Sequence, residues 1–278
     1  MTARQLLLSA WDWEPSVVIG CAALLVLYFA YVRQLRTGRS ILFVTGVVVL
    51  LLDLVSPIDV LSDNYLFSVH MLQHLLLIFA VAPLFIWGLP RDFAARMLAR
   101  TPVGAAERIL SRPAIAWSTG TLALAIWHIP FLYNLALGNE DIHICQHLTF
   151  LITAVIFWWP VLNPLPELRL SIGPTVLYLF SAAMFNSILG IIITFAPLGW
   201  YPAYLHPKDE LGILSLIRNQ WRISAAVDQQ IGGLLMWVPA GFIYFTMIVT
   251  AVVKWQSESD KSLVAESADY TRRGHDAA

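Results

Sequence analysis

A long apolar run opens with the stretch Ser68-Val69-His70-Met71-Leu72-Gln73-His74 and continues to Leu89. His70 and His74 are four residues apart, so a helix places both imidazoles on one face. A second pair with the same spacing, His143 and His147, opens another apolar run, and His128 lies near the end of a third. Polar groups are costly inside a membrane and usually functional there. These histidines are therefore the first candidates for a site.

The composition is typical of a membrane protein. Of 278 residues, 58% are hydrophobic and only 13% are charged, a balance too apolar for an ordinary soluble domain. The net charge of −1 gives no indication of nucleic-acid binding. The two cysteines, Cys21 and Cys145, form neither a disulfide framework nor a CxxC motif. We expect no cleavable signal, so the first apolar run is interpreted as a retained helix.

Seven apolar runs approach the roughly 20 residues that a bilayer-spanning helix needs. They cover residues 16–32, 41–55, 65–89, 113–131, 142–162, 174–195 and 231–254. The sequence shows no internal repeat and no second domain. It therefore predicts an all-α, polytopic membrane protein with seven transmembrane helices in one bundle over residues 1–255. The polar segment 256–278 is expected to be a disordered cytoplasmic tail.

The distribution of Lys and Arg predicts the orientation. If the seven runs alternate across the bilayer, 13 basic residues fall on one side: Arg33, Arg36, Arg39, Arg91, Arg96, Arg100, Arg108, Arg112, Arg169, Lys254, Lys261, Arg272 and Arg273. The other side has only Arg4, Lys208, Arg218 and Arg222. Basic loops stay in the cytoplasm, so we expect an outside N-terminus and a cytoplasmic C-terminus. The basic loop 90–112 should lie along the inner surface as an amphipathic helix.

With this orientation, the unusual polar groups gather in the outer leaflet. Asp53, Asp59 and Asp63 lie at the outer mouth of the second and third spans, and Asp228 opens the seventh. Outer carboxylates would concentrate cations. The longest outer loop, 196–227, is rich in aromatic residues and proline.

Facing helices that each carry a His-x-x-x-His pair can bind a metal ion. Imidazole is a common ligand for copper, zinc and iron, whereas thioether and thiolate groups favour Cu(I). Met71 and Cys145 lie at similar heights to the histidines and are weaker candidates, because Met usually fills a core and Cys145 points to another helix face than His143 and His147. The alternative is that each histidine only forms hydrogen bonds to a neighbouring helix.

Several motifs follow one another in a specific order: Ser56-Pro57-Ile58-Asp59, His70-Met71-Leu72-Gln73-His74, Ala82-Pro83, Gly88-Leu89-Pro90, Trp127-His128-Ile129-Pro130, Phe157-Trp158-Trp159-Pro160 and Asp228-Gln229-Gln230-Ile231-Gly232-Gly233. This combination resembles the multi-pass CtaG family of cytochrome c oxidase assembly factors. The resemblance implies a seven-helix protein of the bacterial cytoplasmic (inner) membrane that is not an enzyme. It also implies a role in delivering copper to haem–copper oxidases.

The resemblance assigns the residues of the expected copper site. The candidate metal ligands are His70, His74, His128, His143 and His147, with Asp59 and Asp228 as polar residues of the family motifs. Met71 and Cys145 are added from their position alone. The expected function is a metallochaperone of the respiratory chain that binds copper at the outer leaflet and passes it to an oxidase subunit, with an outer-side copper chaperone as a potential donor.

Two other functions remain open. A b-type haem held between His74 and His147 would make the chain a redox membrane protein. A metal-free scaffold would instead grip oxidase intermediates through the aromatic outer loop.

Overall fold

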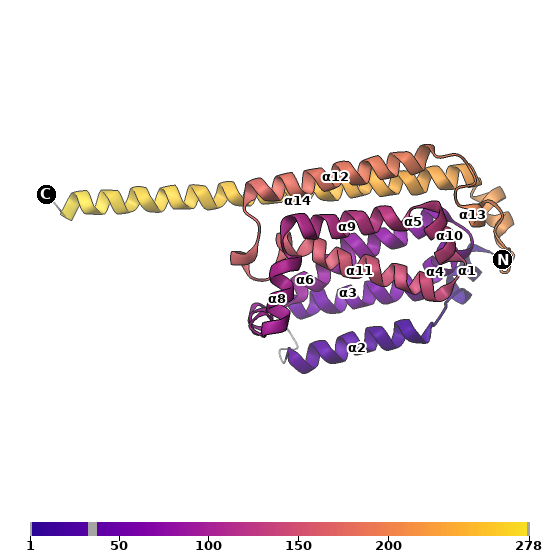
Figure 1. Ribbon diagram of the computed structural model, residues 1–278, viewed down its shortest axis with the longest axis horizontal. Helices are drawn as coiled ribbons and strands as arrows, with labels where there is room; N and C mark the ends of the chain where they lie inside the picture. The colour runs from indigo at the N-terminus through magenta and orange to yellow at the C-terminus, as the bar shows by residue number, and fades with distance from the viewer. Residues whose placement is uncertain (1, 33–37, 277–278) are drawn as a thin grey trace.

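The computed structural model describes residues 2–32 and 38–276, and every regular element in these two ranges is helical (Figure 1). Arg33 and Arg36, used above for the orientation, lie outside the described residues. The elements are α1 (Ala3–Ser9), α2 (Pro15–Tyr31), α3 (Gly38–Val55), α4 (Pro57–Asn64), α5 (Phe67–Leu76), the π-helix η1 (Leu77–Val81), α6 (Ala82–Gly88), α7 (Arg91–Leu98), α8 (Thr101–Leu110), α9 (Pro113–Trp127), α10 (Pro130–Leu137), α11 (Glu140–Leu162), the 3₁₀ turn η2 (Pro166–Leu168), α12 (Ile172–Phe195), α13 (Pro202–Leu205), the π-helix η3 (Leu216–Gln220) and α14 (Ala225–Asp276).

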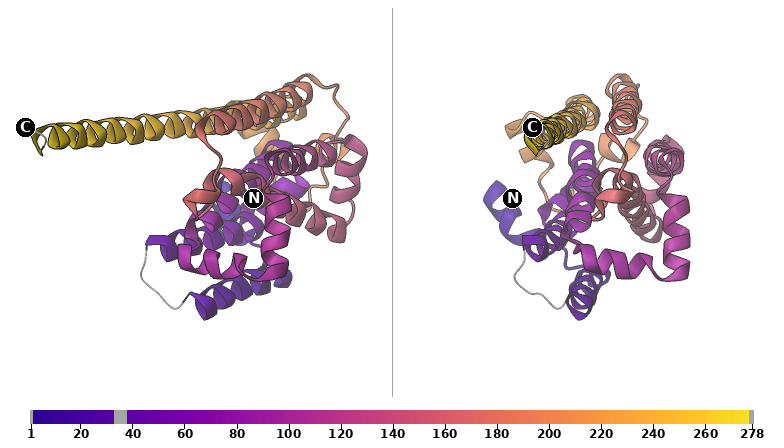
Figure 2. Two further views of the ribbon diagram at one scale, coloured as in Figure 1. Left: turned by 60° about the vertical axis from the view of Figure 1, so that its left-hand side comes forward. Right: turned by 90° about the vertical axis from the view of Figure 1, so that its left-hand side faces the viewer.

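The long helices run side by side in one bundle (Figure 1). Helices α3, α5, α6, α9 and α11 form its centre, α2 flanks one side, and α12 pairs with α14 on the other (Figures 1 and 2). The short helices α1, α4, α10 and α13 gather at the end where the N-terminus lies, which we call the α4 end. Helix α8 lies at the opposite end, the α8 end.

The number of spans is lower than the expected seven by length and composition. Five helical segments are long and apolar enough to cross a membrane, and α9 makes a sixth if it is counted together with α8, from which it is bent by 76°. Helix α2 is apolar but only 17 residues long. Each predicted run nonetheless coincides with a helix. Seven spans therefore remain a prediction, which requires α2 to cross the membrane as the seventh span.

The basic loop 90–112 and the C-terminal segment from residue 256 both differ in part from the structure expected for them. The basic loop 90–112 is helical, as predicted, but it forms the two helices α7 and α8 rather than one. Helix α14 continues to Asp276, whereas we expect a disordered tail from residue 256. The segment has no proline and only one glycine, Gly274. A helix already anchored in the bundle can therefore propagate through it, because elongation is much less costly than nucleation.

The third span is not a uniform α-helix. Its α5 and α6 segments are joined by the π-helical turn η1, which the N–H of Ala82 closes by bonding to the carbonyl of Leu77. Pro83 follows directly and has no N–H to continue an α-helical ladder. Turns of this type often occur at functional sites, and this one begins three residues after His74.

Candidate metal centre

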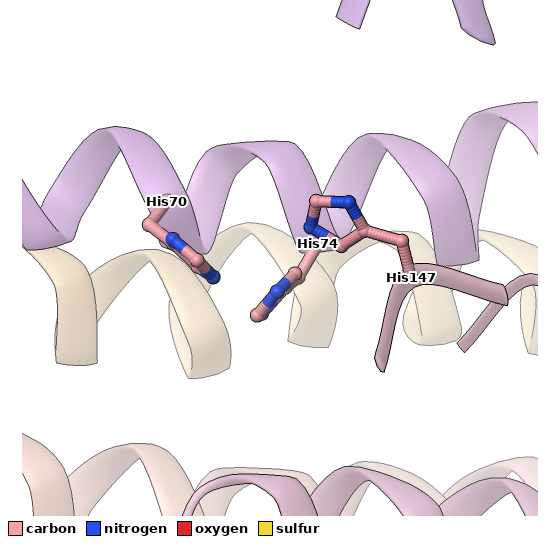
Figure 3. A group of neighbouring side chains, drawn as sticks. All are labelled: His70, His74 and His147. Atoms are coloured by element: carbon pink, nitrogen blue, oxygen red, sulfur yellow. The ribbon is translucent and has the colours of Figure 1, made fainter. Parts of the chain in front are cut away.

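Four histidines from two helices meet near the α4 end of the bundle. Helix α5 carries His70 and His74, and α11 carries His143 and His147. The ring centroids of His70 and His74 are 4.3 Å apart, and that of His147 lies 5.6 Å from His74. Figure 3 shows the side chains of His70, His74 and His147 converging. The two histidine pairs, which the sequence places on two separate helices, thus lie close together in the structure.

The ligand atoms fall into two groups that share one residue. One atom each from His70, His74 and His147 lies within 4.8 Å of the others, and the same holds for Asp63, His70 and His143. The second group is nearer to solvent, because the side chain of Asp63 is 30% exposed and that of His143 is 12% exposed. His70 is fully buried and belongs to both groups. Two adjacent candidate positions for a metal ion thus share His70.

The ring nitrogens lack the hydrogen bonds that buried polar atoms normally make. Both nitrogens of His74 and the Nε2 atoms of His70, His143 and His147 are buried without a partner among the described residues. Leaving a buried donor or acceptor unpaired costs about 1–3 kcal/mol each. A bound metal ion would give the unprotonated nitrogens a ligand, so the donor set fits a transition metal that accepts imidazole.

Asp63 orients the ring of His143 and lies close to that of His70. Its carboxylate oxygens lie 3.3 Å from His143 Nδ1 and 3.8 Å from His70 Nδ1. Burial raises the pKa of Asp63, but the hydrogen bond and charge of His143 outweigh it and lower the pKa to about 2. The ionised carboxylate therefore accepts from Nδ1 and leaves Nε2 of His143 free for a metal, an arrangement common around metal-ligating histidines. Sequence analysis placed Asp63 at the mouth of the site but not among its ligands.

Tyr204 is a site residue that sequence analysis missed. Its hydroxyl donates to the carbonyl of Ser62 (2.8 Å) and lies 3.1 Å from His70 Nδ1 and 3.0 Å from the hydroxyl of Tyr133. Burial raises the pKa of Tyr204, so the phenol keeps its single proton and donates it in the hydrogen bond to the Ser62 carbonyl. The phenol oxygen then accepts from His70 Nδ1. This fixes the tautomer in which Nε2 of His70 carries a lone pair.

Asp59, one of the predicted site residues, joins α4 to α5 instead of joining either histidine group. Gln73 Nε2 donates to Asp59 Oδ1 (2.8 Å) and to the main-chain oxygen of Asp53 (3.0 Å), while Ser62 Oγ lies 3.0 Å from Gln73 Oε1. Burial and then the charge of Asp63 raise the pKa of Asp59 to about 7. Asp59 thus fixes α4 against α5, the helix that carries His70 and His74.

The other predicted residues lie around the cluster. Asp228 accepts hydrogen bonds from the N–H groups of Phe67 and Ser68 and from the Ser68 hydroxyl, so it anchors the first turn of α5. Cys145 is exposed and belongs to neither ligand group. Met71 and His128 are buried and adjacent, with 3.3 Å between Met71 Sδ and His128 Nε2.

Comparison with known proteins identifies the family. The family model described as cytochrome c oxidase caa3 assembly factor (Caa3_CtaG) matches residues 26–258. The chain belongs to the Caa3_CtaG family. This match confirms the resemblance noted from the sequence motifs, and it covers all five candidate histidines. The description of the family is of an assembly role and not of a reaction.

Several similar curated proteins are mycobacterial and are themselves described only as uncharacterized. Mb0105 of Mycobacterium bovis and MT0111 of Mycobacterium tuberculosis are each 24% identical to the chain over 274 residues, which is 89% of this chain and 40% of the relative. ML1998 of Mycobacterium leprae is 24% identical over 282 residues, with 91% of this chain and 41% of the relative covered. The chain thus spans about two fifths of their length. No solved structure matches it significantly.

Proposed function

We propose that this chain binds copper at the α5–α11 histidine cluster and assists its insertion into a haem–copper oxidase of the bacterial cytoplasmic membrane. The observation that carries the proposal is the set of buried imidazole nitrogens without partners, found in a chain of an oxidase-assembly family. Copper is the cargo here, and an oxidase subunit docked beside the chain is the expected recipient. An outer-side chaperone would be the donor.

Two connected ligand groups suit the transfer of an ion better than its permanent storage. Asp63 and His143 are partly exposed and would receive the ion. The buried His74, together with His147, would hold it deeper in the bundle. Since His70 belongs to both groups, an ion can pass inward without losing all its ligands at once. The direction of passage remains part of the proposal.

The space near the cluster favours a single ion over haem. A b-type haem between His74 and His147 needs a slot for the porphyrin between its two axial rings. The ring centroids of these residues are 5.6 Å apart, and the cavity that His74 lines has a volume of about 10 Å³. A porphyrin is far larger. Binding a haem between His74 and His147 would therefore require α5 and α11 to separate.

The test is the copper stoichiometry of the full chain, purified in detergent and loaded with Cu(II). We expect the His74→Ala and His147→Ala variants to lose the bound Cu(II), because each removes a ligand that the remaining buried residues cannot replace. His206→Ala is the matched control, since His206 is exposed in the loop after α13 and should change nothing. Unchanged Cu(II) in both cluster variants would make the histidines structural and favour the scaffold function.

A further inference from the structure

A small cavity lies against the side chain of His74. Its volume is about 10 Å³, enough for one small atom or ion and about the minimum for a water molecule. The side chains of Met71, His74, His128 and Met236 line it, together with apolar residues of α5, η1 and α9 and Asn186 of α12. All four named side chains are at most 3% exposed. The cavity therefore brings two thioethers and two imidazoles together away from solvent.

The tautomer of His128 directs the lone pair of Nε2 toward the sulfur of Met71. His128 Nδ1 lies 2.6 Å from the carbonyl oxygen of Leu124, and since a carbonyl only accepts, Nδ1 carries the proton. In the neutral ring Nε2 is then unprotonated. It lies 3.3 Å from Met71 Sδ, which is also an acceptor. Two lone-pair groups thus face each other with no proton between them, as two ligands of one ion do.

Helix α14 brings Met236 to the same place by close packing. A Cβ at Gly232 would lie 2.4 Å from the ring of Phe67 and 3.2 Å from Met71 Cγ, so only glycine lets α14 approach α5 this closely. Asn186 Nδ2 donates to the main-chain oxygen of Met236 (2.6 Å) and fixes that turn. Met71 and Met236 consequently belong to one buried cluster.

His74 connects the cavity to the histidine cluster. Both of its ring nitrogens are without a hydrogen-bond partner in the described structure. Its ring centroid is 5.6 Å from that of His147 on one side and 5.7 Å from that of His128 on the other. One nitrogen can therefore serve the cluster while the other serves the cavity.

We propose that this cavity is a separate site for Cu(I), with Met71, Met236 and His128 as ligands and His74 shared with the histidine cluster. The inference rests on the proposed function in taking copper as the cargo. Thioether ligands select Cu(I) over harder divalent ions. The ligands change from carboxylate and imidazole at the surface to imidazole and thioether inside, so the inner position discriminates in favour of the reduced ion.

The experiment uses the full chain in detergent without oxygen, with every protein carrying Cys145→Ser so that the exposed thiol supplies no sulfur. Cu(I) is offered against a competing chelator, and X-ray absorption at the copper edge reports sulfur neighbours. Zn(II), which is redox-inert, probes the histidine cluster in the same proteins. The test variant combines Met71→Leu and Met236→Leu, which nearly conserve volume. Met184→Leu, at an exposed position of α12, is the control.

We expect sulfur neighbours for Cu(I) in the parent protein and in Met184→Leu, and loss of both the sulfur signal and the Cu(I) in the double variant, with Zn(II) binding retained. His147→Ala should show the reverse, retaining the Cu(I)–sulfur signal and losing Zn(II). Cu(I) with only nitrogen or oxygen neighbours, or a double variant that still retains Cu(I), would overturn the inference and leave a cavity for water only. Loss of Zn(II) in His147→Ala would then still support the histidine cluster, so the two proposals fail separately.

Discussion

His70 belongs to both ligand groups, and its two ring nitrogens have different surroundings. Nδ1 lies against the Tyr204 hydroxyl and 3.8 Å from Asp63, whereas Nε2 is buried without a partner. A ring held at one nitrogen presents the other in a fixed direction and tautomer. The residues that do this come from α4 and the loop containing α13, so the cluster is completed by elements outside the two histidine helices.

Tyr204→Phe tests this orienting role. The variant keeps the ring and removes the hydroxyl that His70, Ser62 and Tyr133 share. Since loss of such an outer partner typically costs about 10–100-fold in metal affinity, we expect Cu(II) affinity to fall by that order while the chain stays folded. The matched control is Tyr178→Phe, which loses a buried hydrogen bond to the Phe157 carbonyl in another part of the bundle. Equal Cu(II) affinities in the two variants would show that Tyr204 is only structural.

The sequence predicts the histidine pairs but not their partners, for a physical reason. A spacing of four residues is enough to place two imidazoles on one helix face, which is why His70 with His74 and His143 with His147 were found. The contact of Tyr204 with His70 joins residues 134 positions apart, and that of His128 with Met71 joins residues 57 apart. Such contacts depend on how loops and helices pack, and no local pattern encodes them.

At the scale of elements, α14 determines where α5 begins and how closely it packs. The carboxylate of Asp228 caps the first turn of α5, and Gly232, one turn further along, lies against the ring of Phe67. Acidic groups stabilise helix N-termini. The sequence predicts both helices but not the contact between Gly232 and Phe67. It does not predict the π-helical turn after His74, because that turn depends on how the span accommodates Pro83 within the bundle.

Gly232→Ala tests this packing. The new methyl group would collide with Phe67 and crowd Met71, and overpacking of this kind costs typically 1–3 kcal/mol. We expect a lower unfolding temperature in detergent and weaker Cu(I) binding at the cavity. Gly241→Ala, in the same helix with no atom within 4 Å of the added Cβ, should be neutral or slightly stabilising. A Gly232→Ala protein as stable as Gly241→Ala would contradict the packing argument.

Over the whole molecule, the candidate site and the basic helices α7 and α8 lie at opposite ends. Asp63, the site residue nearest to solvent, comes from α4 at the α4 end, whereas α7 and α8 carry Arg91, Arg96 and Arg108 (Figure 1). Burial and then the charges of Arg91 and Arg39 lower the pKa of Arg169. Segments rich in Arg and Lys tend to remain in the cytoplasm, so we expect the site to face outward.

Reporter fusions test this orientation. A phosphatase that is active only when exported should be active when fused after Lys208, in the loop between α12 and α14, and inactive when fused after Lys254. The expected pattern follows from the excess of basic residues in the segments on the other side. A phosphatase active only after Lys254 would invert the chain, and the copper would then have to come from the cytoplasm.

The last prediction concerns the oxidase that we propose the chain helps to assemble. Cells without the chain should make the oxidase polypeptides but little active enzyme, and added copper should partly restore activity, because mass action can replace a delivery step but not a lost scaffold. His147→Ala introduced into these cells should behave like the deletion, whereas His206→Ala should restore activity. The measurement is oxidase turnover per oxidase polypeptide at matched levels of each variant in the membrane. Full activity with His147→Ala would separate assembly from copper binding and assign the assembly role to the aromatic loop around Tyr201 and Tyr204.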